Sequence, residues 1–253
     1  MTTTSRHEAV GADHPTGARR WATPITVALV LIGIAIYLQT ASLDTIEARA
    51  LSGDNLLQAF QRHMALTLTS TVIVLLIGIP LGVVLTRRWA RPFAPIVLAF
   101  ANAGQAIPSI GILVLLAILV DVGFRMALVA LVAYALLPVL RNTMVGIGQV
   151  DPALMDAGRG MGMSSARLLR HVELPLAVPV IVAGVRVALI LNVGVATLAT
   201  YTNAGGLGDI IATGIALNRM PVLVVGSLLT ICLALTVDWI AGQAETYLKP
   251  KGI

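Results

Sequence analysis

The sequence is poor in the residue types that build metal centres, redox sites and soluble surfaces. Cys232 is the only cysteine among 253 residues, so neither an intrachain disulfide nor a thiolate metal cluster can form. Charged residues make up only 11% of the chain, less than in ordinary soluble domains. Hydrophobic residues make up 57%, and the mean hydropathy is +0.91. This composition predicts an integral membrane protein with no metal and no other cofactor.

The chain also lacks a phosphate-binding loop. The pattern GxxxxGK[ST] does not occur, and neither Lys249 nor Lys251 follows a glycine. Any ATP hydrolysis that drives this protein must therefore come from another subunit. A membrane enzyme is a poor alternative, because the apolar runs contain no His, Asp or Glu pairs at ligand spacing and no Ser or Cys with a nearby base. We predict no catalytic residue.

Six apolar runs are long enough to cross a bilayer as helices, which takes about 17–25 residues. They cover residues 22–38, 63–86, 94–120, 124–140, 175–199 and 221–244. They are too long for barrel strands and show no two-residue alternation. We therefore expect an all-α bundle of six transmembrane helices. A cleaved signal peptide is the alternative for the first run, but residues 39–42 make a poor cleavage site.

Basic residues predict how the chain is oriented in the membrane. With the N-terminus in the cytoplasm, twelve of the seventeen arginines and lysines fall in cytoplasmic segments. Only Arg49, Arg62, Arg125 and Arg219 fall outside, and Arg186 lies within a span. This bias places both termini and the 141–174 loop in the cytoplasm. It also explains the isoelectric point near 10.0 without nucleic acid, because these charges face anionic lipid.

The apolar runs and the polar segments between them divide the chain into four parts. Residues 1–20 are expected to form a disordered cytoplasmic tail, and residues 21–62 an extra first span with an outward-facing segment. Residues 63–244 form the main membrane domain, and 245–253 a second cytoplasmic tail. The half-polar 200–220 connection is expected to fold back into the protein, because irregular backbone at membrane depth must be covered.

The longest polar stretch in the middle of the chain begins at Asp151. Asp151 and Pro152 are typical of an N-cap followed by proline in the first turn, so a short helix should start there. Gly162 is a natural residue to end it, and Ser164 can cap a second short helix. We expect Pro175 to break that second helix and open the next span. The prediction is a two-helix loop on the cytoplasmic face.

The spacing in this loop resembles the EAA loop of permeases in binding-protein-dependent ABC importers. That loop has Glu-Ala-Ala, then Gly, then Ile-x-Leu-Pro at fixed offsets. The matching residues here are Asp156, Ala157, Gly158, Gly162, Val172, Leu174 and Pro175. Asp156 replaces the glutamate and Gly158 the second alanine. Periodicity alone would favour a solvated loop with no partner.

The resemblance implies a role for each matched residue. Asp156, Ala157, Gly158 and Gly162 would form a docking surface for a cytosolic ABC ATPase dimer. Leu174 and Pro175 would couple this loop to the span that follows.

The sequence from residue 63 to about 244 is similar to one branch of this family, the osmoprotectant permeases. The similarity lies in GMGMS, VELPLAVPVIVAGVR, NVGVATLAT and AGGLGDII. It implies a type I ABC importer for glycine betaine, choline, carnitine or a similar amine, working by alternating access. The implied partners are the ATPase dimer, an extracytoplasmic binding protein and a second permease, identical or paralogous. A permease for methionine or another small solute, and a passive channel, are the alternatives.

Polar residues within and between the spans are candidates for the substrate pathway or its gate. They are Gln105, Pro108, Asn192, Thr197, Thr200, Tyr201, Asn203, Gly205 and Gly206. Such groups usually face a bundle interior or a pathway. A simple packing kink at 105–109 and an inert turn at 204–208 are the alternatives. Residues 78–82 (GIPLG) suit close helix packing or a gating hinge.

Arg186 is the most costly residue to place in a membrane, and we expect it to pair with Asp238 in the last span. A substrate site at Arg186 is the alternative. The eleven aromatic residues lie mostly near span ends, leaving Phe100, Tyr134 and Tyr201 for the interior. These are too few for a tight aromatic cage around a quaternary amine. The resemblance likewise assigns selectivity to the binding protein.

Overall fold

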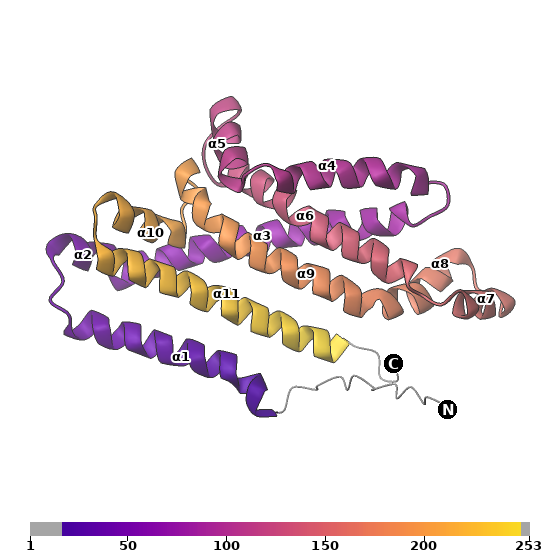
Figure 1. Ribbon diagram of the computed structural model, residues 1–253, viewed down its shortest axis with the longest axis horizontal. Coiled ribbons are helices and arrows are strands. Elements are labelled where there is room, and N and C mark those ends of the chain that lie inside the picture. The colour runs from indigo at the N-terminus through magenta and orange to yellow at the C-terminus, as the bar shows by residue number, and fades with distance from the viewer. Residues whose placement is uncertain (1–16, 249–253) are drawn as a thin grey trace, which may run out of the picture.

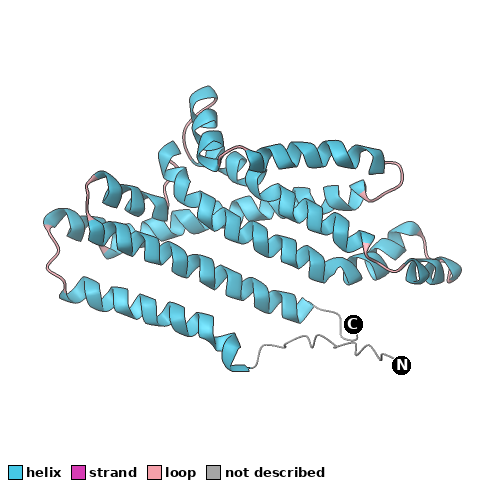
Figure 2. Ribbon diagram, in the orientation of Figure 1, coloured by secondary structure: helices cyan, strands magenta, loops and turns pink. Residues whose placement is uncertain are grey.

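The computed structural model describes residues 17–248, and all regular elements within this range are helical (Figures 1 and 2). The first half contains α1 (Gly17–Thr40), α2 (Thr45–Ala50), α3 (Gly53–Leu85), η1 (Arg91–Phe93), α4 (Ala94–Ala106), α5 (Ser109–Leu119) and α6 (Phe124–Gly148). The second half contains α7 (Pro152–Gly160), α8 (Ser165–Leu168), η2 (Leu169–Glu173), α9 (Leu174–Ala196), η3 (Thr197–Thr202), α10 (Leu207–Ala216) and α11 (Met220–Leu248). The predicted all-α class is confirmed.

Five of these helices are long and apolar enough to cross a membrane, at the positions of five predicted runs. The remaining run, 94–120, is not one straight helix. It divides into α4 and α5, which meet at an angle of 93°. Residues 107–108 between them are extended, because the residue before a proline disfavours helical backbone. The bundle therefore has five long spans and one bent pair.

Helix α6 lies at the centre of the bundle, packed against both α3 and α9 (Figure 1). Glycines allow these helices to approach closely. A Cβ at Gly82 would lie 2.7 Å from Thr143 Cβ, and a Cβ at Gly184 would lie 2.8 Å from the Pro138 carbonyl oxygen. The close-packing interpretation of residues 78–82 is therefore correct, and α3 runs through Pro80 without a break.

Several predicted boundaries move. The N-terminal tail was predicted to extend to residue 20, but α1 begins at Gly17; residues 1–16 lie outside the described part. Helix α3 begins at Gly53, ten residues before the predicted run. Its first turns mix polar and apolar residues, so they are not part of the apolar run from which the span was predicted. Helix α11 continues to Leu248 through the start of the predicted C-terminal tail, whose residues 249–253 are not described.

The loop helices α7 and α8 lie at one end of the bundle, and α2 and α10 lie at the other (Figure 1). We call these the α7 end and the α10 end. As predicted, the 200–220 connection folds back into the protein: η3 and α10 pack onto α5, α9 and α11. Leu207, Ile210 and Gly214 of α10 are buried.

Helix α1 lies along α11 at the edge of the bundle (Figure 1). Ile34 of α1 joins a buried cluster with Val225 and Leu233 of α11. At the α7 end of this pair, the rings of Trp21 and Trp239 lie 6.1 Å apart. Most of the remaining α1 surface is exposed in the single chain, which suits a helix surrounded by lipid.

The packing of α10 depends on Gly208, which generates a first prediction. A Cβ at this position would lie 1.9 Å from the backbone oxygen of Thr197, and backbone atoms cannot move aside as a side chain can. We expect Gly208→Ala to lower the Tm of the detergent-purified protein by several degrees, since overpacking typically costs about 1–3 kcal/mol. Gly194→Ala is the control, because a Cβ there would meet no atom of residues 17–248 within 4 Å beyond its own stretch of helix backbone. Equal Tm values for the two variants would contradict this packing.

Candidate functional site

The loop at the α7 end is a compact pair of helices fixed by its own capping groups. The carboxylate of Asp151 accepts a hydrogen bond from the Ala153 N–H at 2.8 Å. Gly162, with φ +80°, ends α7 in a Schellman turn: its N–H bonds to the Arg159 carbonyl, and the Met163 N–H bonds to the Gly158 carbonyl. The predicted helix start and glycine stop are both correct, and Ser164 caps α8 through the Arg167 N–H.

The residues predicted to dock an ATPase do not all face outward. Asp156 and Ala157 are exposed on α7, and Asp156 pairs with Arg159 at 2.8 Å. Gly158, in contrast, is buried within the chain, where a Cβ would lie 2.5 Å from Leu168 Cδ2. Its lack of a side chain lets α7 and α8 pack together. Gly158 therefore supports the exposed surface from behind and is not part of it.

The prediction that Pro175 breaks the second loop helix is wrong. Helices α8, η2 and α9 form one continuous helix through residues 165–202. The five residues of η2 form a π-helical turn, in which the Leu174 N–H bonds to the Leu169 carbonyl five residues back. This wider turn accommodates Pro175, whose ring would clash with the preceding turn of a regular α-helix. Leu174 packs on Ile147 and Ile181, so the loop joins the bundle without a hinge in the backbone.

Sequence reasoning missed an ion pair at this end. Glu173, the last residue of η2, is only 4% exposed and pairs with Arg87, just after α3. The Arg87 Nη1 donates to Glu173 Oε1 at 3.1 Å, and Nη2 also contacts Oε2. A sequence signal did exist: an acidic residue beside an apolar span needs a cation, and Arg87 follows another span directly.

At the α10 end, the glycines of the predicted gate form a buried turn against α3. Gly205 and Gly206 have φ values of +83° and +114°, which side chains rarely adopt. They pack on Arg62 and His63 respectively. His63 is fully buried: its Nε2 lies 3.1 Å from the Val193 carbonyl oxygen. Its Nδ1 accepts a hydrogen bond from the Leu207 N–H at 3.3 Å.

His63 thereby joins α3 to α9 and to the first residue of α10. It was also missed, since a histidine at the start of an apolar run gives no sign of its partners.

The other predicted pathway residues lie near this end but are mostly bonded within the chain. Asn192 is fully buried and donates to Thr71 Oγ1 at 3.0 Å, while its own oxygen has no hydrogen-bond partner among the described residues. The Thr197 hydroxyl bonds to the Gly194 carbonyl at 2.7 Å. Gln105 donates to the Tyr134 carbonyl at 2.8 Å, which ties α4 to α6 beside the bend.

The remaining candidates lie at the surface of the same end. Pro108, the N-cap of α5, is exposed, and Tyr201 is 54% exposed. Thr200 accepts a backbone bond from Asn203, which is left-handed at φ +56°. Helix α5 packs against η3, so both groups of candidates meet at one end. Their part in a substrate pathway stays a prediction.

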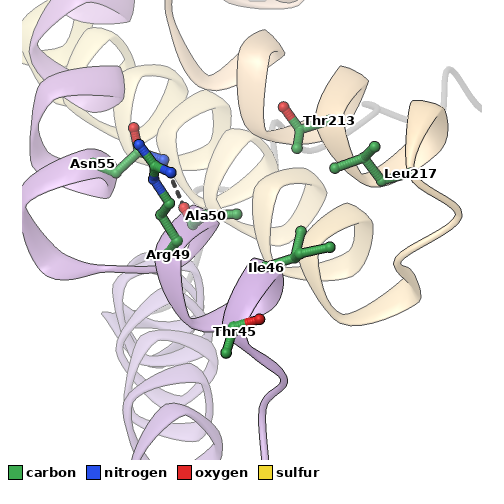
Figure 3. Close-up of a pocket in the computed structure, with 7 residues that line it drawn as sticks. All are labelled: Thr45, Ile46, Arg49, Ala50, Asn55, Thr213 and Leu217. Atoms are coloured by element: carbon green, nitrogen blue, oxygen red, sulfur yellow. Dashed lines mark hydrogen bonds between the residues drawn. The ribbon is translucent and has the colours of Figure 1, made fainter.

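The α10 end also carries an open pocket of about 650 Å³ between α2, α3 and α10 (Figure 3). Arg49 and Asn55 lie on one side, and Thr213 of α10 and Leu217, just after α10, lie on the other. The Asn55 amide donates to the Ala50 carbonyl at 2.7 Å, which closes the α2–α3 corner (Figure 3). Within residues 17–248, His, Cys, Asp and Glu do not gather in threes that could hold a metal.

The predicted Arg186–Asp238 pair is present between α9 and α11. Arg186 Nε and Nη2 donate to the two carboxylate oxygens of Asp238 at 2.5 and 2.8 Å. Glu245 lies 3.8 Å from Nη1 of the same guanidinium. Two acidic groups from α11 thus compensate the charge in α9, which supports the structural interpretation of Arg186.

Charge exchange tests this interpretation. We expect Arg186→Asp or Asp238→Arg alone to reduce the yield of monodisperse protein in detergent, because each leaves two like charges facing each other. The double exchange restores an opposite pair, so it should recover most of the yield and the Tm. A double variant no better than either single variant would exclude a pairing role.

Comparison with known proteins places this geometry in a family. A family model described as the inner membrane component of binding-protein-dependent transport systems matches residues 78–247. The osmoprotectant import permease protein OsmY of Salmonella typhimurium is 37% identical over 225 residues, which cover 89% of this chain and 94% of that protein. The choline transport system permease protein OpuBB of Bacillus subtilis is 40% identical over 202 residues, covering 80% and 92%.

Among solved structures, an inward-facing methionine ABC transporter, MetNI, aligns with a TM-score of 0.68 and 25% identity, covering 77% of this chain and 96% of that one. An amino acid ABC transporter with histidines aligns with a TM-score of 0.65 at 17% identity, a likeness of fold alone. The family match covers the central helices α6 and α9 together with the loop between them. The chain belongs to the family of inner membrane components of binding-protein-dependent transport systems, the permeases of ABC importers.

Proposed function

We propose that this chain is the permease subunit of an ATP-driven importer for glycine betaine, choline, carnitine or a similar compatible solute. The observation that carries the proposal is the α7–α8 loop, a rigid protrusion that continues into a spanning helix without a hinge. Relatives named for osmoprotectant, choline and carnitine transport are 37–40% identical over most of the chain. The methionine transporter is a more distant neighbour at 25% identity.

The α7 end would face the cytoplasm. Arg87, Arg88 and Arg91 cluster just after α3 at this end, and Arg141 lies in the last turns of α6. Basic residues concentrate on the cytoplasmic side of membrane proteins. Residues 63–244 would form the type I transmembrane domain, with α1 and residues 41–62 added in front of it. The family match to residues 78–247 supports that division.

A cytosolic ATPase dimer would dock on the α7–α8 loop. Asp156, Ala157 and Gly162 are exposed there, and Gly158 lets Leu168 support them from below. A short helix of this kind can lie in a groove of a partner. Because Leu174 and Pro175 continue the same helix into α9, movement of the docked subunits would be passed to the spans and alternate their access.

Two further partners complete the proposed transporter. A binding protein outside the cell would select the solute, since Phe100, Tyr134 and Tyr201 are too few for an aromatic cage, and Phe100 and Tyr201 are largely exposed. A second permease would complete the pathway. Two differently named permeases of a glycine betaine/carnitine/choline system occur in Bacillus subtilis, which is consistent with such pairing. ATP hydrolysis would belong to the separate subunits.

Uptake into vesicles tests the function. The complete transporter, with ATPase and binding protein, should accumulate at least one of labelled glycine betaine, choline or carnitine only when ATP can be hydrolysed. Labelled methionine should not accumulate. Uptake at the same rate without ATP would indicate a passive channel, and uptake of methionine alone would indicate the other permease class.

A variant pair tests the docking surface in the same assay. Ala157→Arg places a long cation on the exposed face of α7, so it should abolish both ATPase binding and uptake. Ala48→Arg is the matched control, an exposed alanine on α2 at the opposite end. If Ala157→Arg transports as well as the control, the loop is not the docking site.

A further inference from the structure

Arg87 and Glu173 make a bidentate contact between two segments that are 86 residues apart in the chain. Arg87 is held at both ends of its guanidinium, since its Nε also donates to the Val83 carbonyl in the last turn of α3 at 3.2 Å. A fork-shaped contact of this type fixes direction as well as distance. The end of α3 is therefore attached in a defined orientation to the end of η2.

Burial makes separation of this ion pair energetically unfavourable. The Glu173 side chain is 6% exposed and that of Arg87 is 29% exposed. Ile147, Ala177 and Ile181 form an apolar cluster beside η2, packed by Val83 of α3. A carboxylate left unpaired there would be strongly unfavourable, so the two segments are expected to move together and not separate.

The position of Glu173 within the chain gives the contact a direction. It is the last residue of the π-helical turn that joins the α7–α8 loop to α9, and π turns within helices are frequent at functional sites. A displacement of the loop reaches residues 169–173 before it reaches the membrane helices. Through α9 it passes up one span, and through Glu173 it also reaches α3.

Helix α3 carries a second contact at its far end. His63 lies 24 residues before Arg87, about 36 Å at 1.5 Å per residue. Its two ring nitrogens contact the Val193 carbonyl and the Leu207 N–H, where the 204–208 turn enters α10. Between these points α3 is an unbroken helix. It connects the loop at the α7 end with the glycine turn at the α10 end.

We propose that Glu173 and Arg87 are positioning residues that transmit displacement of the α7–α8 loop to α3, and that His63 passes it to the 204–208 turn. This inference rests on the proposed function and deepens it, because it adds a second mechanical connection to the direct one through α9. Loss of the pair leaves the docking surface intact but uncouples ATP hydrolysis from transport.

The test measures ATP hydrolysed per solute imported by the complete transporter in vesicles, together with stimulation of its ATPase by the binding protein. Glu173→Gln removes the charge at nearly constant shape. We expect it to raise the ATP-to-solute ratio severalfold, because hydrolysis continues while less movement reaches the spans, with unchanged copurification of the ATPase. Arg219→Gln is the control, since it breaks the Arg219–Asp44 ion pair at the α10 end; its ratio should stay at the wild-type value.

Two further variants separate coupling from folding. Arg87→Lys keeps the charge but loses the bidentate geometry, so it should fold and still raise the ratio. The double exchange Arg87→Glu with Glu173→Arg should return the ratio toward wild type. A wild-type ratio in both Glu173→Gln and Arg87→Lys, or a double exchange no better than the single variants, overturns the inference.

Failure of the proposed function would look different. If the wild-type complex imports none of the tested solutes with ATP, the proposed function is contradicted. The pair is then judged by ATPase stimulation in the same samples, which needs no identified solute. Stimulation of Glu173→Gln equal to wild type would overturn the inference independently.

Discussion

The structure depends on the close approach of three helices, α3, α6 and α9, within an apolar surrounding. Lipid offers no hydrophobic drive for helices to associate, so contact area between small residues and satisfied polar groups must hold them together. Gly82 against Thr143 and Gly184 against Pro138 bring the backbones near enough for such contact. The buried Asn192–Thr71 hydrogen bond then joins α9 to α3. A rigid central unit results, on which the peripheral α1 and the bent α4–α5 pair rest.

This rigid unit connects the α7 end of the molecule with the α10 end. The α7–α8 loop continues into α9 through a π turn, and Glu173 attaches the same turn to α3. At the other end His63 and Gly206 bring α3 into contact with the turn before α10. Force applied at one end thus has two parallel helices along which to travel. The proposed transporter, in which the ATPase is a separate subunit, would use an arrangement of this kind.

The architecture could largely be predicted from the sequence because lipid permits few solutions. Five of the apolar runs and the capping residues Asp151, Gly162 and Ser164 act locally, and the structure has helices and caps where they predict them. The arginine bias predicts an orientation in the membrane, which stays a prediction. The Arg186–Asp238 pair was also found, since a charge in a span has few possible partners.

The failures have physical reasons of a different kind. Pro175 should end a helix by local rules, but the wider π turn of η2 receives it. A kink was expected at residues 105–109, but the 93° angle between α4 and α5 depends on how the two helices pack and could not be read from the sequence. Gly158, assigned to the docking surface, is buried by Leu168. Arg87, His63 and their partners lie far apart in sequence, so only the folded chain brings them together.

Coupling between the two ends is tested most directly by a nucleotide-dependent signal at the α10 end, opposite the proposed ATPase docking loop. Tyr201 is exposed at the α10 end, so Tyr201→Cys in a Cys232→Ala background offers one site for a spin label. In the complete transporter, a non-hydrolysable ATP analogue should change the spectrum of this label, because the loop displacement reaches the α10 end. Identical spectra with and without nucleotide, with the ATPase bound in both, would contradict coupling along the bundle.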